Sequence, residues 1–187
     1  MSGSGLTVTT LGDRELVLTR TFAAPRPLLF DALTRPELLQ RWYGAQGWNL
    51  IECEVDLRVG GAWRYVSRGP GREVMTQYGV YREVEAPRRL VYTERFVDQS
   101  FAGESLITAV LEDRGERTTL RSTVRFPSPQ ARALVLSRPM ERGLGESYHR
   151  LDRVLAVERA AGDGSHHCRV APSAPPAGSE VDARRAP

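Results

Sequence analysis

The sequence predicts an α+β domain in which a curved antiparallel sheet with two short helices wraps around a long C-terminal helix. Short segments of alternating polarity, separated by Gly and Pro turns, fill the middle of the chain. Two short helical patterns precede most of them, and one long amphipathic pattern follows. A sheet of this kind has one apolar face to cover, and only the last helix is long enough to cover it.

The 187 residues suit one domain plus a tail. We expect residues 1–11 to be a flexible N-terminus and residues 12–162 to be the domain. Residues 163–187 are rich in Pro, Ala, Ser and Gly, so we expect a disordered tail. No run approaches the ~20 apolar residues that span a bilayer, and no secretory signal is visible. We therefore expect a cytoplasmic protein without membrane insertion.

The net charge of +3 arises from arginines alone, because the chain contains no lysine. The arginines are interleaved with acids, as in Arg82-Glu83, which is typical of a solvated surface of mixed charge. We therefore expect no nucleic-acid partner. Cys53 falls in an expected strand and Cys168 in the tail, so both are expected to be free thiols.

The first elements are a strand and two short helices. Glu15–Phe22 alternates as a strand does, with Arg20 on the same parity as its apolar residues. Pro27 suits the first turn of the first helix. Thr34 and Glu37 have the spacing of a capping box, which predicts the start of a second helix that ends at Gly44.

The middle of the chain has strand character throughout. Ile51, Cys53, Val55 and Leu57 alternate with charged residues, which predicts one buried and one wet face. Further strands are expected over residues 62–67, 72–84, 89–97, 104–112 and 117–126.

The end of the chain is helical, with a short helix from Pro129 and a long one from about Met140 to Ala161. The long helix carries a one-sided apolar stripe at helical spacing. The stripe consists of Met140, Leu144, Tyr148, Leu151 and Leu155.

Four sequence blocks occur in order with consistent spacing: residues 19–42, 56–64, 79–90 and 143–155. Over residues 12–160 the chain resembles the bacterial proteins named after the activator of Hsp90 ATPase, the AHSA1-like branch of the START/Bet v 1-like SRPBCC superfamily. The resemblance implies a helix-grip (Bet v 1-like/START-like) fold with a cavity between the sheet and the C-terminal helix.

Relatives in this superfamily are associated with lipid, polyketide or hormone binding, some with cyclase or hydrolytic chemistry, and the namesake with Hsp90. The resemblance therefore implies binding of a small hydrophobic ligand (lipid-, polyketide- or aromatic-like) without a tightly bound cofactor. One alternative is a cyclase/aromatase- or hydrolase-type enzyme. Another is a co-chaperone that activates an Hsp90-type ATPase, so a chaperone partner and a homodimer both stay open. Fold alone does not choose among them.

Large rings with a polar tip suit a ligand cavity, although plain core packing explains any single ring as well. Tyr81 belongs to the aromatic residues expected to border the cavity. The candidate ligand-binding residues are Trp42, Trp63, Tyr65, Tyr78, Tyr92, Glu94, Phe96, Leu144 and Tyr148.

Two polar residues have alternative placements. Glu94 faces the cavity if Tyr92 and Phe96 face it. Burial there would raise the pKa of Glu94. The carboxyl group could then bind a ligand, or act with Tyr92 as an acid or base. The opposite parity, with Glu94 at the surface beside an arginine, is the one we favour. Arg20 either reaches the interior and needs a carboxylate partner or snorkels at the sheet edge; we favour the second.

The remaining residues give no clear indication of catalysis or metal binding. His149 lies about 100° from the apolar stripe, so we expect it on the helix surface. The His166-His167-Cys168 run has unsuitable geometry for a metal ion. Neither a nucleophile elbow nor a phosphate-binding loop is recognisable. We therefore assign no catalytic residue, metal or cofactor.

Overall fold

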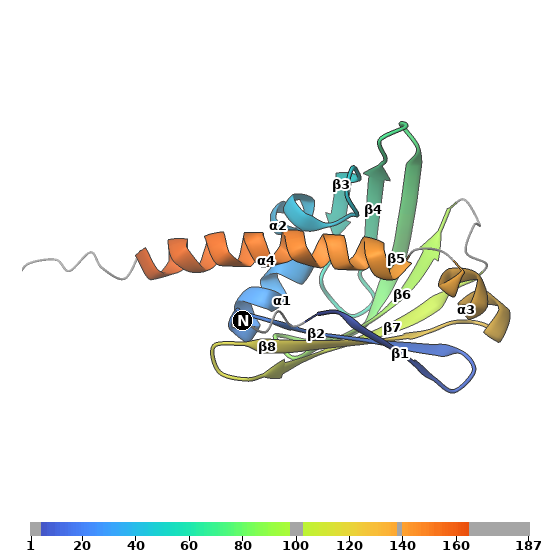
Figure 1. Ribbon diagram of the computed structural model, residues 1–187, viewed down its shortest axis with the longest axis horizontal. Helices are drawn as coiled ribbons and strands as arrows, with labels where there is room; N and C mark the ends of the chain where they lie inside the picture. The colour runs from blue at the N-terminus through green and yellow to red at the C-terminus, as the bar shows by residue number, and fades with distance from the viewer. Residues whose placement is uncertain (1–4, 98–102, 138–139, 165–187) are drawn as a thin grey trace, which may run out of the picture.

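A computed structural model describes residues 5–97, 103–137 and 140–164, and the described part forms an antiparallel sheet with four helices (Figure 1). The strands are β1 (Thr7–Leu11), β2 (Glu15–Phe22), β3 (Asn49–Val55), β4 (Ala62–Arg68), β5 (Val74–Glu85), β6 (Arg89–Phe96), β7 (Ser105–Asp113) and β8 (Thr118–Arg125). The helices are α1 (Arg26–Thr34), α2 (Pro36–Trp42), α3 (Pro129–Leu136) and α4 (Met140–Gly164). The predicted fold class and the order of its elements are confirmed.

The sheet has the strand order β1-β2-β8-β7-β6-β5-β4-β3, with every neighbouring pair antiparallel. It is strongly bent, so that β3, β4 and β5 rise steeply from the part formed by β1, β2 and β8 (Figure 1). The orange helix α4 lies along the concave side, with α1 and α2 beside it, and its C-terminal turns extend past the sheet. Among the described helices, none is both long and apolar enough to cross a membrane.

The apolar stripe of α4 seals the middle of the concave face. Tyr148, Leu151 and Leu155 are buried in the main core, whereas Met140 and Leu144 at the start of the helix are only half-buried. Met140 packs instead on a small second cluster with Leu16. Packing is therefore tightest in the middle of α4 and looser near its start.

Two local predictions were wrong. Residues 7–11, expected in a flexible N-terminus, form β1 and pair with β2. The helix α2 begins after Arg35 without a side-chain cap, because the Thr34 hydroxyl donates to the Phe30 carbonyl (2.8 Å) and Glu37 pairs with Arg35. The sequence cannot show that Thr34 still belongs to the preceding helix.

The alternation over residues 51–57 is only partly confirmed. Cys53 and Val55 pack against the core, but Ile51 and Leu57 are exposed. A register shift between Leu50 and Glu52 turns Leu50 inward and leaves Ile51 on the outer face. Leu57 lies beyond the end of β3.

Arg20 is buried, which overturns the favoured placement at the sheet edge. Its side chain retains only 5% exposure and forms an ion pair with Asp152 of α4. The guanidinium also lies 5.2 Å from the ring centroid of Phe22 and 5.7 Å from that of Tyr148. The pair therefore links β2 to α4 across the core. The neighbouring His149 is exposed, as predicted.

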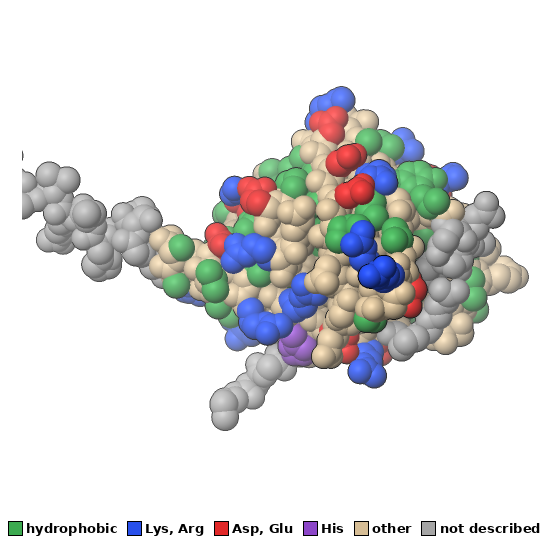
Figure 2. All heavy atoms as spheres, turned by 90° about the horizontal axis from the view of Figure 1, so that it is seen from above, with side chains coloured by type: hydrophobic (Ala, Val, Ile, Leu, Met, Phe, Trp, Pro, Cys, Tyr) green, Lys and Arg blue, Asp and Glu red, His purple; other side chains and the backbone are tan. Residues whose placement is uncertain are grey.

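On the face shown in Figure 2, basic and acidic side chains are interspersed rather than segregated. Most ion pairs of the described residues join exposed neighbours on this kind of surface, such as Arg89 with Glu83 and Arg95 with Glu104. This arrangement agrees with the mixed-charge surface inferred from composition. Cys53 is a free thiol, whereas Cys168, the His166-His167 pair and the tail from residue 165 lie outside the described residues.

Candidate functional site

The concave faces of β4, β5 and β6 carry the residues of the candidate site. Trp63 and Tyr65 of β4 pair with Gly79 and Gln77 of β5, and Tyr81 of β5 pairs with Tyr92 of β6. Because alternate residues of a strand share a face, this register brings Glu94 and Phe96 onto the same side as Tyr92. The parity that we favoured for β6 is therefore wrong, and Glu94 faces inward.

The rings form a continuous aromatic wall. Trp63 lies 4.7 Å from Tyr65 and 5.7 Å from Tyr92, measured between ring centroids. Tyr65 lies 5.1 Å from Tyr43, the residue that follows α2. Tyr43 in turn lies 5.6 Å from Trp42. Most of these contacts are tilted or edge-on, the geometry that stabilises aromatic pairs.

Helix α4 contributes Tyr148 to the aromatic wall, from the side opposite the sheet. Its ring lies 5.4 Å from Phe22 and 6.3 Å from Trp42. The ring of Trp42 is fixed because its indole Nε1 donates to the Ala32 carbonyl (2.8 Å). The wall thus spans β2, α2, β4, β5, β6 and α4.

Polar groups lie within this apolar setting. Burial raises the pKa of Tyr81 and of Tyr148 to about 12, and raises that of Tyr43, Tyr65 and Tyr92 well above its ordinary value. These phenols are therefore neutral donors and acceptors at physiological pH. With two further polar side chains they make up what we term the interior cluster: Tyr43, Tyr65, Gln77, Tyr81, Tyr92, Glu94 and Tyr148.

Some polar groups of the cluster satisfy one another. The Tyr43 hydroxyl donates to Gln77 Oε1, and the hydroxyls of Tyr65 and Tyr81 interact. Glu94 differs, since no hydrogen bond or ion pair reaches its carboxylate from the described residues. A carboxylate that is largely shielded from water and has no partner is costly, so the position of Glu94 calls for an explanation.

Burial alone raises the pKa of Glu94 to about 7. The charge of Glu94 is in turn the second cause, after burial, of the raised pKa values of Tyr43 and Tyr92, so both phenols lie close to it. Yet the side chains of Glu94, Tyr43 and Tyr92 each keep part of their accessible surface. These three groups are therefore largely, but not completely, shielded from solvent.

The β5–β6 ladder is irregular beside Glu94. The backbone N–H of Val80 donates to the Thr93 hydroxyl (3.2 Å), and Trp63 Nε1 donates to the Thr93 carbonyl (3.2 Å). A Cβ on Gly79 would lie only 1.7 Å from that carbonyl oxygen, so glycine is required there. Irregularities of this kind re-aim side chains and are common next to functional sites.

The structure brings together most of the predicted site residues. Trp42, Trp63, Tyr65 and Tyr148 are buried. Tyr92, Glu94, Phe96 and Leu144 are half-buried at the same concave side. Tyr78 does not belong with them, because it lies on the outer face of β5 and is 40% exposed.

Sequence reasoning missed Tyr43 and Gln77. A signal for Gln77 existed, because it shares a strand parity with Tyr81, but the inward parity of β5 was unknown. Tyr43 follows the last turn of a short helix, where neither helical nor strand periodicity indicates which way a side chain points.

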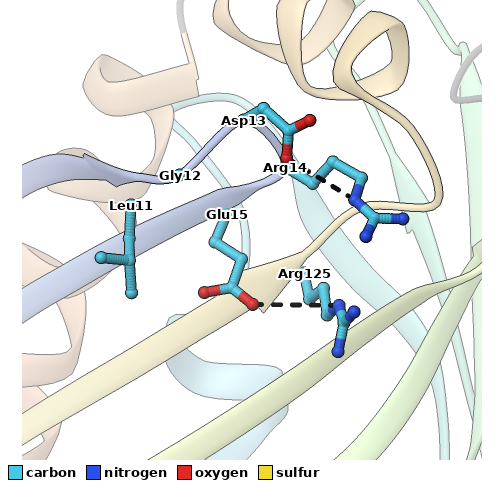
Figure 3. Close-up of a pocket in the computed structure, with 6 residues that line it drawn as sticks. All are labelled: Leu11, Gly12, Asp13, Arg14, Glu15 and Arg125. Atoms are coloured by element: carbon cyan, nitrogen blue, oxygen red, sulfur yellow. Dashed lines mark ion pairs between the residues drawn. The ribbon is translucent and has the colours of Figure 1, made fainter.

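Two hollows of the described residues lie at the surface rather than between the sheet and α4. One, of about 290 Å³, surrounds the β1–β2 turn, where Asp13 pairs with Arg14 (3.7 Å) and Glu15 with Arg125 (3.8 Å) (Figure 3). These mutual ion pairs leave no charge directed at a ligand.

The other hollow, of about 380 Å³, lies between α2 and α4 and is lined by three arginines. Arg41 is paired with Glu158, and Arg150 donates to the carbonyls of Gly44 (3.2 Å) and Trp48 (3.0 Å). Two of its three arginines are therefore engaged in holding the fold together. Neither hollow competes with the interior cluster as a site.

Comparison with known proteins agrees with this architecture. The family model described as "Activator of Hsp90 ATPase homolog 1-like protein" matches residues 23–156. A crystal structure of a Rhodobacter sphaeroides protein is 32% identical, covers 82% of this chain and 99% of its own, and has a TM-score of 0.78. Among the curated proteins, no match is found.

Two further crystal structures are similar. A Nitrosomonas europaea protein is 25% identical over 81% of this chain and 99% of its own, with a TM-score of 0.72. A protein from Silicibacter pomeroyi named AHSA1 is 23% identical over 77% of this chain and 99% of its own, with a TM-score of 0.64, and shows a similar fold.

Proposed function

The chain belongs to the Activator of Hsp90 ATPase homolog 1-like family, and we propose that it binds a small, mainly apolar molecule between the sheet and α4. The observation that carries this proposal is the unpaired Glu94 among tyrosine hydroxyls on an otherwise aromatic face. A mostly apolar lining with a few convergent polar groups is the usual chemistry of a ligand site.

The ligand enters at the end of the concave face near the start of α4. Leu144 faces the sheet from the same stripe as Tyr148, yet it is half-buried and belongs to neither core cluster of the described residues. Phe96 and Glu94 are half-buried on the strand opposite. The incomplete packing of Leu144 supports binding of a ligand's apolar body at this end of the sheet, at the cost of little rearrangement.

Apolar burial supplies the affinity and the polar groups supply orientation. Each buried apolar Å² contributes about 25 cal/mol in favour of binding, before the entropy of association is subtracted. The tyrosine hydroxyls and Glu94 then select a ligand whose polar atoms match them, because an unmatched buried polar group is costly. A cytoplasmic location is part of this proposal.

Titration with the neutral dye Nile red tests interior binding. Wild-type protein is expected to bind the dye and shift its emission to shorter wavelength. Leu144→Glu, which adds a charge to the inward stripe, is expected to weaken binding about tenfold or more. His149→Glu, on the exposed side of the same helix, serves as the control and is expected to bind as wild type does. Absence of dye binding, or equal binding by Leu144→Glu, would contradict the proposal.

A further inference from the structure

We propose that the bound molecule is an organic cation, an apolar or aromatic body whose protonated amine pairs with Glu94. This inference rests on the proposed function and names its ligand class. It follows from the isolated negative charge of Glu94, the aromatic residues beside it and the pairing of Arg20 and Arg95 with other acids.

Glu94 has no cationic neighbour in the described part of the chain. Arg20, which also faces inward, is paired with Asp152. Arg95, the next residue along β6, pairs with Glu104 through Nε and Oε2 (3.1 Å) and is exposed. The position across the β6–β7 ladder is Ser105, which carries no charge. An ionised Glu94 is therefore an uncompensated acceptor that a cationic donor would match.

The surroundings of Glu94 suit an ammonium group in particular. Tyr43 and Tyr92 lie close to its carboxylate, and Trp63 lies 5.7 Å from Tyr92 between ring centroids. Aromatic faces attract cations through their ring quadrupoles, most strongly when water is excluded. The phenols stay neutral because their pKa values are raised, so they add dipoles rather than further charge.

Other ligand classes fit less well. A carboxylate or phosphate would meet the charge of Glu94 in a medium where like charges repel strongly. A neutral alcohol would satisfy Glu94 with a hydrogen bond but leave its charge unpaired. A metal ion would need several ligands, and the described residues contain no group of three or more His, Cys, Asp or Glu side chains placed to hold one.

Three probes that share one apolar body separate these classes: 2-naphthylmethylamine, 2-naphthylmethanol and 2-naphthoic acid. Their dissociation constants for the full chain are measured by isothermal titration calorimetry at about pH 7.5 and low salt. The amine is expected to bind about tenfold more tightly than the alcohol, because its positive charge adds a direct attraction to the Glu94 carboxylate that a neutral hydroxyl lacks. The acid is expected to bind most weakly.

Two variants test whether Glu94 causes the preference for the amine. Glu94→Gln is expected to abolish the advantage of the amine while changing the affinity of the alcohol by less than about threefold. Glu83→Gln, on β5, replaces an exposed glutamate that is paired with Arg89, and it is expected to leave all three affinities unchanged.

The outcomes distinguish the two proposals. Equal or tighter binding of the alcohol or the acid, or an amine preference that survives Glu94→Gln, would overturn the cationic ligand class while leaving interior binding intact. Failure of all three probes, together with absence of Nile red binding, would overturn both proposals.

Discussion

Replacing Glu94 with Gln is expected to stabilise the protein above neutral pH and to have little effect in acid. Burial raises the pKa of this carboxyl from 4.5 to about 7. The folded state therefore favours the protonated form, and the contribution of Glu94 to stability is most favourable below about pH 4.5. It falls as the pH rises toward about 7, where the full cost of holding a buried carboxylate has appeared. Glutamine carries no such cost at any pH.

The magnitude follows from the difference between the two pKa values. A difference of about 2.5 corresponds to about 3.4 kcal/mol at 1.36 kcal/mol for each pKa unit. Because Glu94 keeps some contact with solvent, we expect a smaller gain of about 2–3 kcal/mol at pH 8. For a domain of this size the gain corresponds to a rise in Tm of roughly 5–10 °C.

Urea unfolding of the wild type and Glu94→Gln, measured at intervals between about pH 4.5 and pH 8, checks this expectation. The two curves of unfolding free energy should converge at about pH 4.5, diverge progressively between about pH 4.5 and pH 7, and run parallel above that. Glu83→Gln, at an exposed ion pair, should change stability by less than about 0.5 kcal/mol throughout. A neutral or destabilising effect of Glu94→Gln at pH 8 would refute the inward, unpaired carboxylate.

Two further predictions concern the frame around the site. Asp152→Asn should cost about 2 kcal/mol in urea unfolding, because it leaves the buried Arg20 without a counter-charge; Asp152 is 40% exposed, which lowers the usual cost. Arg20→Met should cost less than Asp152→Asn, and the reverse order would contradict a buried guanidinium. Gly79→Ala should lower the Tm by several degrees, equivalent to about 2 kcal/mol or more, since its Cβ would overlap the Thr93 carbonyl. Gly145→Ala on α4, with open space at its Cβ, should instead raise the Tm slightly, and equal effects of the two alanines would count against the close approach at Gly79.

The order of elements was predictable because each kind of element leaves a periodic signal. Strand β2 was predicted with the bounds that the structure shows, and the α4 stripe was predicted with Tyr148, Leu151 and Leu155 on its buried side. Most apolar residues of both elements lie on the buried side, so polarity in the sequence indicates which side is buried.

The sequence could not predict which face of β6 points inward, because both of its faces are partly apolar. Leu90 and Tyr92 face the core, but Val91 and Thr93 on the other parity are buried as well. When both faces of a strand are buried, the sequence has no polar side that indicates which residues point inward. The inward-facing residues of β6 are set instead by its pairing with β5, which is a property of the assembled sheet.

Arg20 was misplaced for a related reason. An arginine among the apolar residues of a strand is commonly explained by snorkelling, in which the guanidinium reaches the solvent. Its burial depends on Asp152, which lies 132 residues away in the sequence on α4. A compensating partner at such a separation leaves no local signal, whereas the exposed His149 was predicted from helix geometry alone.

The most direct measurement of the site is the titration of the Glu94 carboxyl carbon by ¹³C NMR, assigned by its loss in Glu94→Gln. In the free protein we expect a pKa of about 7. With saturating 2-naphthylmethylamine we expect that pKa to fall, because a bound ammonium stabilises the carboxylate. A Glu94 that titrates near 4.5 and does not respond to the amine would contradict an interior ligand site built around this residue.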